Sequence, residues 1–257
     1  MNPLAEIRNS LIKSISLTIK KRISSDPKWH KVLVKRLYES GSLLNTAFIS
    51  LNYDIIIDNR LTEKHHLDYG VEFINSEDSD NSDRQEPKKA VKLFKLHGSL
   101  NWLYCPTCLN IRLTPRKKTA TKLATERTPC PICNGLLKWI IVLPTYFKPL
   151  SNYYLRQVWV NAEKDLRQIK RIYFCGYSFP DADIHIKYLL KRIEISLKND
   201  LEVFIINHQK RKKKHQALQE KKRYQRFFKN GRKIHYKEFS FQKFCRDGVG
   251  DLKDCYR

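Results

Sequence analysis

The chain has 257 residues and a formal net charge of +24. This length suffices for one good hydrophobic core, or for one core with a small additional module. Hydrophobic residues at 41% and charged residues at 30% fit a globular protein, and no apolar run reaches the roughly 20 residues that span a bilayer. The amino terminus carries neither a basic n-region nor a long apolar h-region, so we expect a cytoplasmic protein without membrane contact.

Helical periodicity dominates the first forty residues, because apolar residues recur there at intervals of three or four. These residues are Leu4, Ile7, Leu11, Ile15, Ile19 and Ile23. Asp26-Pro27 interrupts the pattern, which resumes over residues 31–40. We therefore expect amino-terminal helices over residues 1–44.

Short apolar runs then alternate with helical patterns. The runs cover residues 47–51, 91–96, 139–143, 171–175 and 201–206, and the helical patterns cover 153–169 and 184–197. Residues 72–86 hold six acids and one arginine and are predicted to form an exposed loop. The alternation predicts an α/β fold with a doubly wound parallel, Rossmann-like sheet, over residues 45–104 and 134–257.

Two cysteine pairs interrupt this pattern, Cys105-Pro106-Thr107-Cys108 and Cys130-Pro131-Ile132-Cys133, and 21 residues separate them. Two thiolates on a tight knuckle can face one ion, and a second knuckle completes the tetrahedral site that zinc prefers. Two disulfides are the alternative, but thiols of a cytoplasmic chain stay reduced. We therefore predict a zinc-ribbon insert over residues 105–133. Three further cysteines are predicted to be free thiols, namely Cys175, Cys245 and Cys255.

Polar residues follow four of the predicted strands. Ligands of doubly wound sheets bind outside the carboxyl ends of the strands, which converge on one crevice. Each of these residue types is also an ordinary turn former, so only their joint placement indicates a binding site. The residues are Asn52, Asp54, His97, Gly176, Ser178 and Asn207.

Three segments, in this order, resemble the sirtuin-like (silent information regulator) family of NAD-dependent proteins, in its diverged bacterial branch. Phe48-Ile49-Ser50-Leu51-Asn52-Tyr53-Asp54 resembles the family's Thr-Gln-Asn-x-Asp segment. Lys95-Leu96-His97-Gly98-Ser99 resembles its catalytic Leu-His-Gly, which a four-cysteine zinc ribbon follows. Cys175-Gly176-Tyr177-Ser178-Phe179-Pro180 resembles its Gly-Thr-Ser-Leu loop. The resemblance extends over residues 45–207.

The resemblance implies that NAD binds and that His97 is the general base acting on the nicotinamide ribose. An imidazole suits this role because its unperturbed pKa lies near neutrality. Asn52 would orient the ribose or the water near the glycosidic carbon, and Asp54 would hold the adjacent polar network.

The same resemblance implies cofactor contacts from the second half of the chain. Gly176 would allow close backbone approach of the dinucleotide, Ser178 would hydrogen-bond it, and Asn207 would meet the adenine ribose. Two features depart from the family: Leu51 replaces a glutamine, and no glycine-rich phosphate loop precedes residue 45. Either the chain is amino-terminally truncated, or the protein has lost the phosphate contacts of that loop.

Two functions follow as hypotheses. The first is an NAD-consuming enzyme that cleaves the nicotinamide–ribose bond. It would either hydrolyse NAD, as in bacterial defence, or deacylate an acylated protein lysine, and we favour hydrolysis. The alternative is a catalytically inactive sirtuin-like zinc scaffold that binds nucleic acid or a protein partner.

Half of the net charge lies in residues 208–237, which hold thirteen Lys or Arg and one acid. Tyr224, Phe227 and Phe228 interleave with these cations, as on a face that stacks bases. The alternative, which we favour, is a basic helix whose aromatic residues pack inward. We therefore expect at most weak, salt-sensitive contact with nucleic acid.

Overall fold

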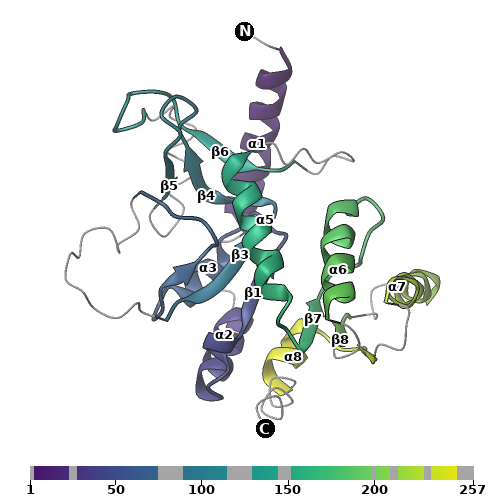
Figure 1. The fold of residues 1–257 in the computed structure, drawn as a ribbon. Helices are drawn as coiled ribbons and strands as arrows, with labels where there is room; N and C mark the ends of the chain where they lie inside the picture. Colours follow the sequence, from purple (N-terminus) through teal and green to yellow (C-terminus); the bar gives the residue numbers. More distant parts are fainter. Residues whose placement is uncertain are drawn as a thin grey trace. The chain divides into compact units, whose positions relative to one another are not determined.

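The computed structural model describes residues 3–22, 28–74, 89–114, 129–143, 152–197, 201–208, 214–228 and 233–247 (Figure 1). The chain divides into two compact units: unit 1 comprises residues 1–30 and 43–160, and unit 2 comprises residues 31–42 and 161–257. Within the described ranges, no helix combines the length and the apolar character needed to cross a membrane.

Unit 1 contains a parallel sheet in the order β1-β3-β2. Its strands are β1 (Ala47–Ser50), β2 (Leu67–Asp68) and β3 (Val91–Lys95). The 3-10 helix η1 (Leu43–Asn45) precedes β1, and helix α3 (Ile56–Leu61) connects β1 to β2. Because Ser50 pairs with Lys95, the carboxyl ends of β1 and β3 lie side by side.

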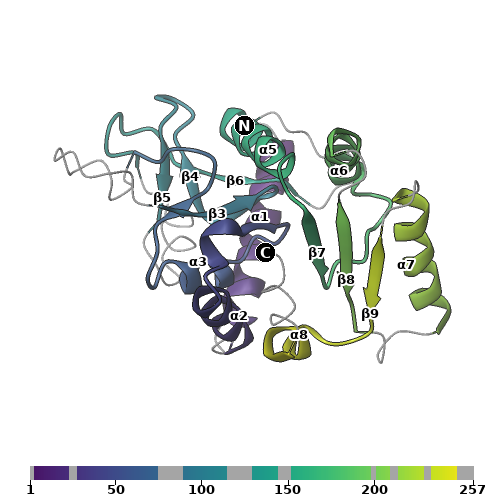
Figure 2. The same cartoon turned by 60° about the horizontal axis from the view of Figure 1, so that its bottom comes forward.

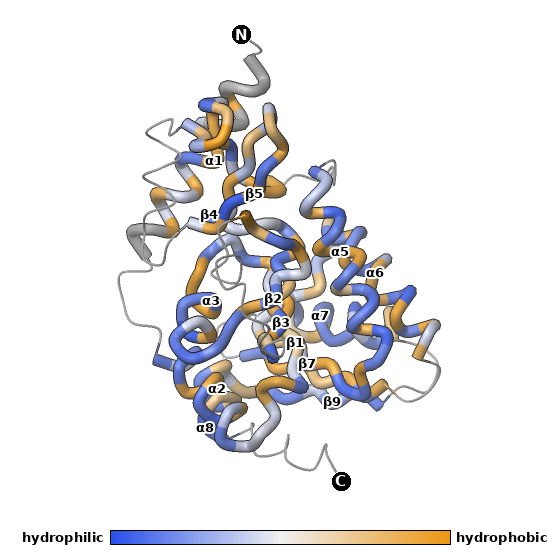
Figure 3. The backbone as a smooth tube through the Cα atoms, turned by 60° about the vertical axis from the view of Figure 1, so that its left-hand side comes forward, coloured by the Kyte–Doolittle hydropathy of each residue, from blue (hydrophilic) through white to orange (hydrophobic). Residues whose placement is uncertain are grey.

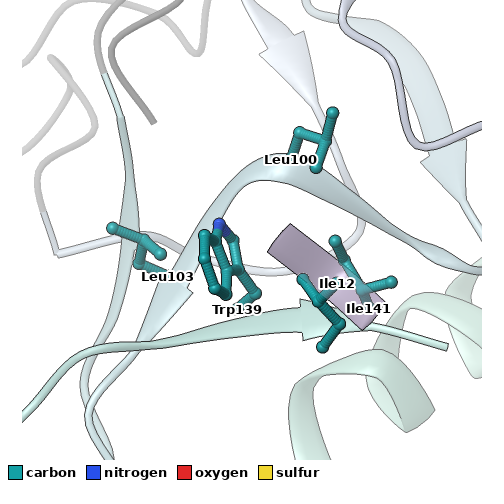
Figure 4. Close-up of a cluster of buried hydrophobic side chains, with 5 residues drawn as sticks. All are labelled: Ile12, Leu100, Leu103, Trp139 and Ile141. Atoms are coloured by element: carbon teal, nitrogen blue, oxygen red, sulfur yellow. The ribbon is translucent and has the colours of Figure 1, made fainter. Parts of the chain in front are cut away.

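An antiparallel sheet in the order β5-β4-β6 completes unit 1. Its strands are β4 (Gly98–Tyr104), β5 (Ile111–Leu113) and β6 (Lys138–Ile141). Helix α1 (Pro3–Arg22) contributes Ile12 to a buried cluster with residues of β4 and β6 (Figure 4). The cluster consists of Ile12, Leu100, Leu103, Trp139 and Ile141.

The buried face of α1 coincides only in part with the stripe that the periodicity predicted, since Ile19 of that stripe packs against the cluster. Ile12 is 1% exposed, whereas Ile7 and Leu11 are 65% and 44% exposed. Ile12 lies on the face that meets Leu100 and Ile141, so the contact with the antiparallel sheet, and not the count of apolar residues, selects the face.

Unit 2 contains a parallel sheet in the order β7-β8-β9 (Figure 2). Its strands are β7 (Arg171–Cys175), β8 (Glu202–Ile206) and β9 (Ile234–Lys237). Helices α6 (Ile184–Ser196) and α7 (Lys214–Phe227) connect them, and α8 (Phe241–Asp247) follows β9. The remaining helices, α2 (Lys28–Glu39) and α5 (Tyr153–Leu166), each contribute residues to both units.

Helices cover both faces of this sheet. The Phe174 ring lies 5.3 Å from that of Tyr224 and 6.0 Å from that of Phe228, at α7. The neighbouring Tyr173 ring instead lies 5.9 Å from that of Phe244 in α8. Since successive side chains of a strand point to opposite faces, α7 and α8 pack on opposite sides. The predicted α/β fold with parallel, Rossmann-like strands is confirmed.

Helix α6 illustrates how the pattern specifies an element. Its buried residues include Ile186, Leu189, Leu190 and Ile193, at the spacing of one helical face. Figure 3 shows hydrophobic and hydrophilic residues alternating along this helix. The predicted strands also form, within a few residues of the expected bounds, but the run 139–143, expected in the parallel sheet, forms β6 of the antiparallel sheet. Most of the predicted acidic loop falls at residues 75–88, outside the described residues.

Candidate functional site

His97 lies in the short connection between β3 and β4 of unit 1. The next residue, Gly98, has a φ of +79°, and a Cβ there would lie 2.0 Å from the carbonyl oxygen of Ile140. Only glycine fits this turn. The carbonyl of His97 accepts a hydrogen bond of 2.9 Å from the N–H of Val142. The backbone of His97 is therefore fixed between the parallel and the antiparallel sheet.

The His97 side chain is 7% exposed, and its Nδ1 lies 3.2 Å from the carbonyl oxygen of Leu51. A carbonyl can only accept, so Nδ1 carries the proton and Nε2 is the basic nitrogen of the neutral ring. Leu51 directly precedes Asn52. The structure thus brings His97 to the segment that carries Asn52.

The loop after β1, residues 51–55, is held by hydrogen bonds. The Tyr53 hydroxyl donates to the carbonyl of Val142 over 2.5 Å, and the Asp54 carboxylate accepts from the N–H of Ile56 over 3.0 Å. Asn52 is exposed. The Asp54 side chain therefore shapes the turn into α3, while the Asn52 side chain can face a ligand.

A buried ion pair lies beside this loop, and sequence analysis did not identify it. Lys95 Nζ lies 3.1 Å from Asp58 Oδ2 and also donates to the backbone carbonyl of Asp54. The Tyr69 hydroxyl donates to Asp58 Oδ1 over 2.9 Å. A signal was present, since Lys95 is a charged residue inside an apolar strand, where an unpaired ammonium would be costly.

The four predicted metal-ligating cysteines form one cluster in unit 1. The Sγ atoms of Cys105 and Cys133 are 3.4 Å apart, those of Cys108 and Cys130 are 3.6 Å apart, and all four lie within 4.8 Å of one another. A tetrahedral site with Zn–S bonds of about 2.3 Å requires S···S separations of about 3.8 Å. The four thiols are therefore positioned to hold one metal ion.

The two knuckles repeat one backbone geometry. In each, the residue after the second cysteine has a positive φ, 58° at Leu109 and 59° at Asn134, and donates its N–H to the carbonyl of the first cysteine. The Asn110 side chain donates to Cys108 Sγ over 3.1 Å. This hydrogen bond is the largest of several effects that together lower the pKa of Cys108 to about 6, which favours the thiolate that binds metal.

All six cysteines that the structure describes are free. Cys175 and Cys245 are among them, as predicted, and Cys255 lies outside the described residues.

The remaining predicted residues belong to unit 2, at the ends of β7 and β8. Gly176 has a φ of +67°, and nothing lies within 4 Å of a Cβ placed there, so the backbone conformation alone favours glycine. Its N–H donates to the carbonyl of Ile206 over 3.0 Å. Ser178 is exposed, and its carbonyl accepts from Arg223 Nη1 over 3.1 Å.

Asn207 is held by a buried carboxylate that sequence analysis also missed. Its Nδ2 donates to Glu220 Oε1 and, over 3.4 Å, to the carbonyl of Tyr177. The Tyr236 hydroxyl donates to the same Glu220 oxygen over 3.2 Å. Because the amide nitrogen serves these acceptors, Oδ1 is the atom of Asn207 that can accept from a ligand hydroxyl.

The aromatic residues of the basic segment pack inward. Tyr224 is 0% exposed and Phe228 is 3% exposed, and both contact Phe174 and Phe179. Burial also raises the pKa of Tyr224, whose hydroxyl donates to the carbonyl of Tyr177 over 2.7 Å. These two rings are therefore part of the core of unit 2 and are not available to stack on bases.

The predicted site residues thus fall into two groups. The structure brings Asn52, Asp54 and His97 together in unit 1. It brings Gly176, Ser178 and Asn207 together in unit 2.

Comparison with solved structures finds sirtuins. One, determined for the structural basis of sirtuin substrate affinity, is 15% identical, with a TM-score of 0.48 over 90% of this chain and 74% of that chain. A Sir2 complex with the inhibitor EX-527, 2'-O-acetyl-ADP-ribose and deacetylated p53 peptide is 16% identical, with a TM-score of 0.47 over 90% and 74%. A Sir2 mutant with p53 peptide and NAD is 16% identical, with a TM-score of 0.46 over 91% and 73%.

Comparison with curated proteins finds no significant match. The SIR2-like domain family matches residues 46–228, which is more than half of the chain and includes His97 and the cysteine cluster. The chain therefore belongs to the family of proteins with a SIR2-like domain.

Proposed function

We propose that this protein binds NAD and cleaves the bond between nicotinamide and ribose, with hydrolysis to ADP-ribose as the net reaction. The observation that carries the proposal is the hydrogen bond between His97 Nδ1 and the Leu51 carbonyl, which leaves Nε2 basic beside the loop of Asn52. Membership of the SIR2-like family supports NAD as the ligand.

In the proposed reaction, the bond between C1′ of the ribose and the nicotinamide nitrogen breaks, and its electron pair leaves with nicotinamide. The pyridinium charge is thereby neutralised. A water oxygen forms the new bond to C1′ and releases one proton. His97 accepts a proton from a ribose hydroxyl, that oxygen takes up the proton that the attacking water releases, and His97 then passes its proton to solvent, so one proton is released overall. Asn52 orients the ribose or the water, while Asp54 holds the turn into α3.

For the strand ends of unit 2, taken by themselves, we propose contacts with a dinucleotide. Gly176 lets the backbone approach the ligand, and Ser178 offers a hydroxyl. Asn207 accepts from a ribose hydroxyl through Oδ1, because Glu220 engages its amide nitrogen. A helix of the basic segment thus contributes to this site through Glu220.

We further propose that the metal ion held by Cys105, Cys108, Cys130 and Cys133 is zinc. Four thiolates with these separations suit its tetrahedral preference. A site closed by four protein ligands braces the ribbon and leaves no coordination position for a substrate.

Nicotinamide release from NAD tests the proposal, measured by chromatography with purified protein. His97→Ala is expected to lower the rate by about 10²–10⁴-fold, the range that a general base supplies. His65→Ala removes a histidine of the same unit outside the site and serves as the matched control. Both variants are expected to keep their zinc and their circular dichroism spectrum.

The products distinguish hydrolysis from lysine deacylation. With an acetylated peptide present, hydrolysis gives ADP-ribose and leaves the peptide acetylated, whereas deacylation transfers the acetyl group to ADP-ribose. Wild-type protein that binds NAD without releasing nicotinamide would contradict catalysis and favour the inactive scaffold. The exposed cations of α7, Lys221, Lys222 and Arg226, would then be the surface to test for salt-sensitive nucleic-acid binding.

A further inference from the structure

Lys95 connects the two segments that carry the proposed catalytic residues. It stands two residues before His97, and its ammonium contacts the carbonyl of Asp54, two residues after Asn52. We propose that Lys95 is a positioning residue, which holds the loop 51–55 against β3 so that Asn52 stays aligned with His97. This inference rests on the proposed function.

The ammonium is fully desolvated, so its contacts determine where it sits. The side chains of Lys95 and Asp58 are 0% and 3% exposed. A buried charge requires a partner, and Asp58 supplies it, while the Tyr69 hydroxyl satisfies the other carboxylate oxygen. With its charge balanced by α3, Lys95 directs a further N–H to the loop backbone.

Besides the contact between the Leu51 carbonyl and His97 Nδ1, this loop has contacts with other parts of unit 1. The Tyr53 carbonyl accepts from the N–H of Leu100 in β4 over 3.0 Å, and the Tyr53 hydroxyl reaches Val142 after β6. These contacts tie the loop to the antiparallel sheet. Lys95, the last residue of β3, adds a second link between the loop and the segment that carries His97.

A set of variants separates positioning from stability. Lys95→Met leaves the buried Asp58 carboxylate without its counter-ion, so it is expected to lower both stability and activity. The triple variant Lys95→Met/Asp58→Leu/Tyr69→Phe removes the ammonium, the carboxylate and the hydroxyl of the network. Such apolar replacements of buried ion pairs are often neutral for stability. The triple variant also lacks the contact with Asp54.

The triple variant is expected to regain stability but not turnover. A misplacement of about 1 Å near the reacting groups costs about 100-fold in rate, so kcat should fall by about 100-fold while KM for NAD changes little. A purely structural network predicts instead that activity returns together with stability. Wild-type kcat in the folded triple variant would overturn the inference. Arg60→Gln/Glu63→Gln removes an ion pair close to α3 and is the matched control.

Amide hydrogen exchange of residues 51–55 provides a readout that does not need activity. Exchange in this loop is expected to be faster in the triple variant than in wild type at equal stability, and exchange at the wild-type rate would overturn the inference. If wild-type protein did not cleave NAD, the proposed function would fail, and loop exchange would still decide the role of Lys95.

Asp58→Asn covers the case in which the triple variant does not fold. This variant keeps Lys95 and its contact with Asp54, so it is expected to lose stability but to keep wild-type loop exchange and most of kcat. A loss of kcat equal to that of Lys95→Met would refute a positioning role.

Discussion

Gly98→Ala tests whether the turn that carries His97 is as tightly constrained as the structure indicates. The substitution adds one methyl group, directed at the backbone of β6. The new Cβ would lie 2.0 Å from the carbonyl oxygen and 2.8 Å from the carbonyl carbon of Ile140. Neither atom belongs to a flexible side chain, so a strand must move.

Two costs add up in this variant. A left-handed φ of +79° costs an L-residue about 1–2 kcal/mol. Relief of the clash moves Gly98 away from β6 and weakens the hydrogen bond from the N–H of Val142, the residue after β6, to the carbonyl of His97. A buried polar group that loses its hydrogen-bond partner costs about 1–3 kcal/mol. We therefore expect a loss of about 2–5 kcal/mol in the free energy of unfolding of unit 1.

Gly41→Ala isolates the first of these costs. Gly41 has a φ of +71°, and nothing lies within 4 Å of an added Cβ. Gly41 belongs to unit 2, and the control is expected to lose only about 1–2 kcal/mol of the free energy of unfolding of that unit. Denaturant unfolding, followed by circular dichroism, measures both variants against wild type. Equal losses in the two variants would show that the turn at His97 can relax, and the argument from close packing would be wrong.

Two further predictions concern the metal and the pH dependence of stability. Cys133→Ser is expected to lower the zinc content below one ion per chain and to loosen residues 105–133; metal-free wild-type protein, purified without chelator, would contradict the zinc assignment. Burial lowers the pKa of His30 from its ordinary value of 6.5, against a smaller opposing effect of Asp54. The unfolded chain then takes up a proton at higher pH than the folded chain, so stability is fully present above about pH 6.5 and falls as the pH drops below it. His30→Gln should flatten this dependence in denaturant midpoints measured between pH 5 and about 8, and an unchanged slope would show that His30 is not responsible.

Elements whose specification is local could be predicted from the sequence. The run 171–175 and strand β7 coincide, because a short apolar segment bounded by polar residues is sufficient to define a buried strand. The cysteine cluster was predicted for the same reason, since each knuckle brings two thiols together within four residues. Only the approach of one knuckle to the other depends on the fold.

The burial of Ile12 could not be predicted, because Ile12 lies outside the apolar stripe of α1. Leu11 belongs to that stripe and is exposed, whereas Ile12 is buried and Ile19, from the stripe, packs against the same cluster. The choice depends on the surface that β4 and β6 present, and that surface forms only when residues 98–104 and 138–141 pair. Periodicity determines that a helix forms, but its partner determines which side packs.

The same limit explains why Glu220 and Lys95 were missed. The contact from Asn207 to Glu220 spans 13 positions, and that from Lys95 to Asp58 spans 37. A lysine inside an apolar strand does indicate a buried carboxylate partner, because an unpaired ammonium could not remain there. The carboxylate that Lys95 meets is set by the fold. Helix α3, which follows β1 and precedes β2 in the chain, brings Asp58 to Lys95 of β3. In unit 1 the Asn52 loop contacts the buried Lys95, and in unit 2 Asn207 contacts the buried Glu220. A search for charges within apolar strands and helix faces is therefore the sequence signal that would have found Lys95 and Glu220.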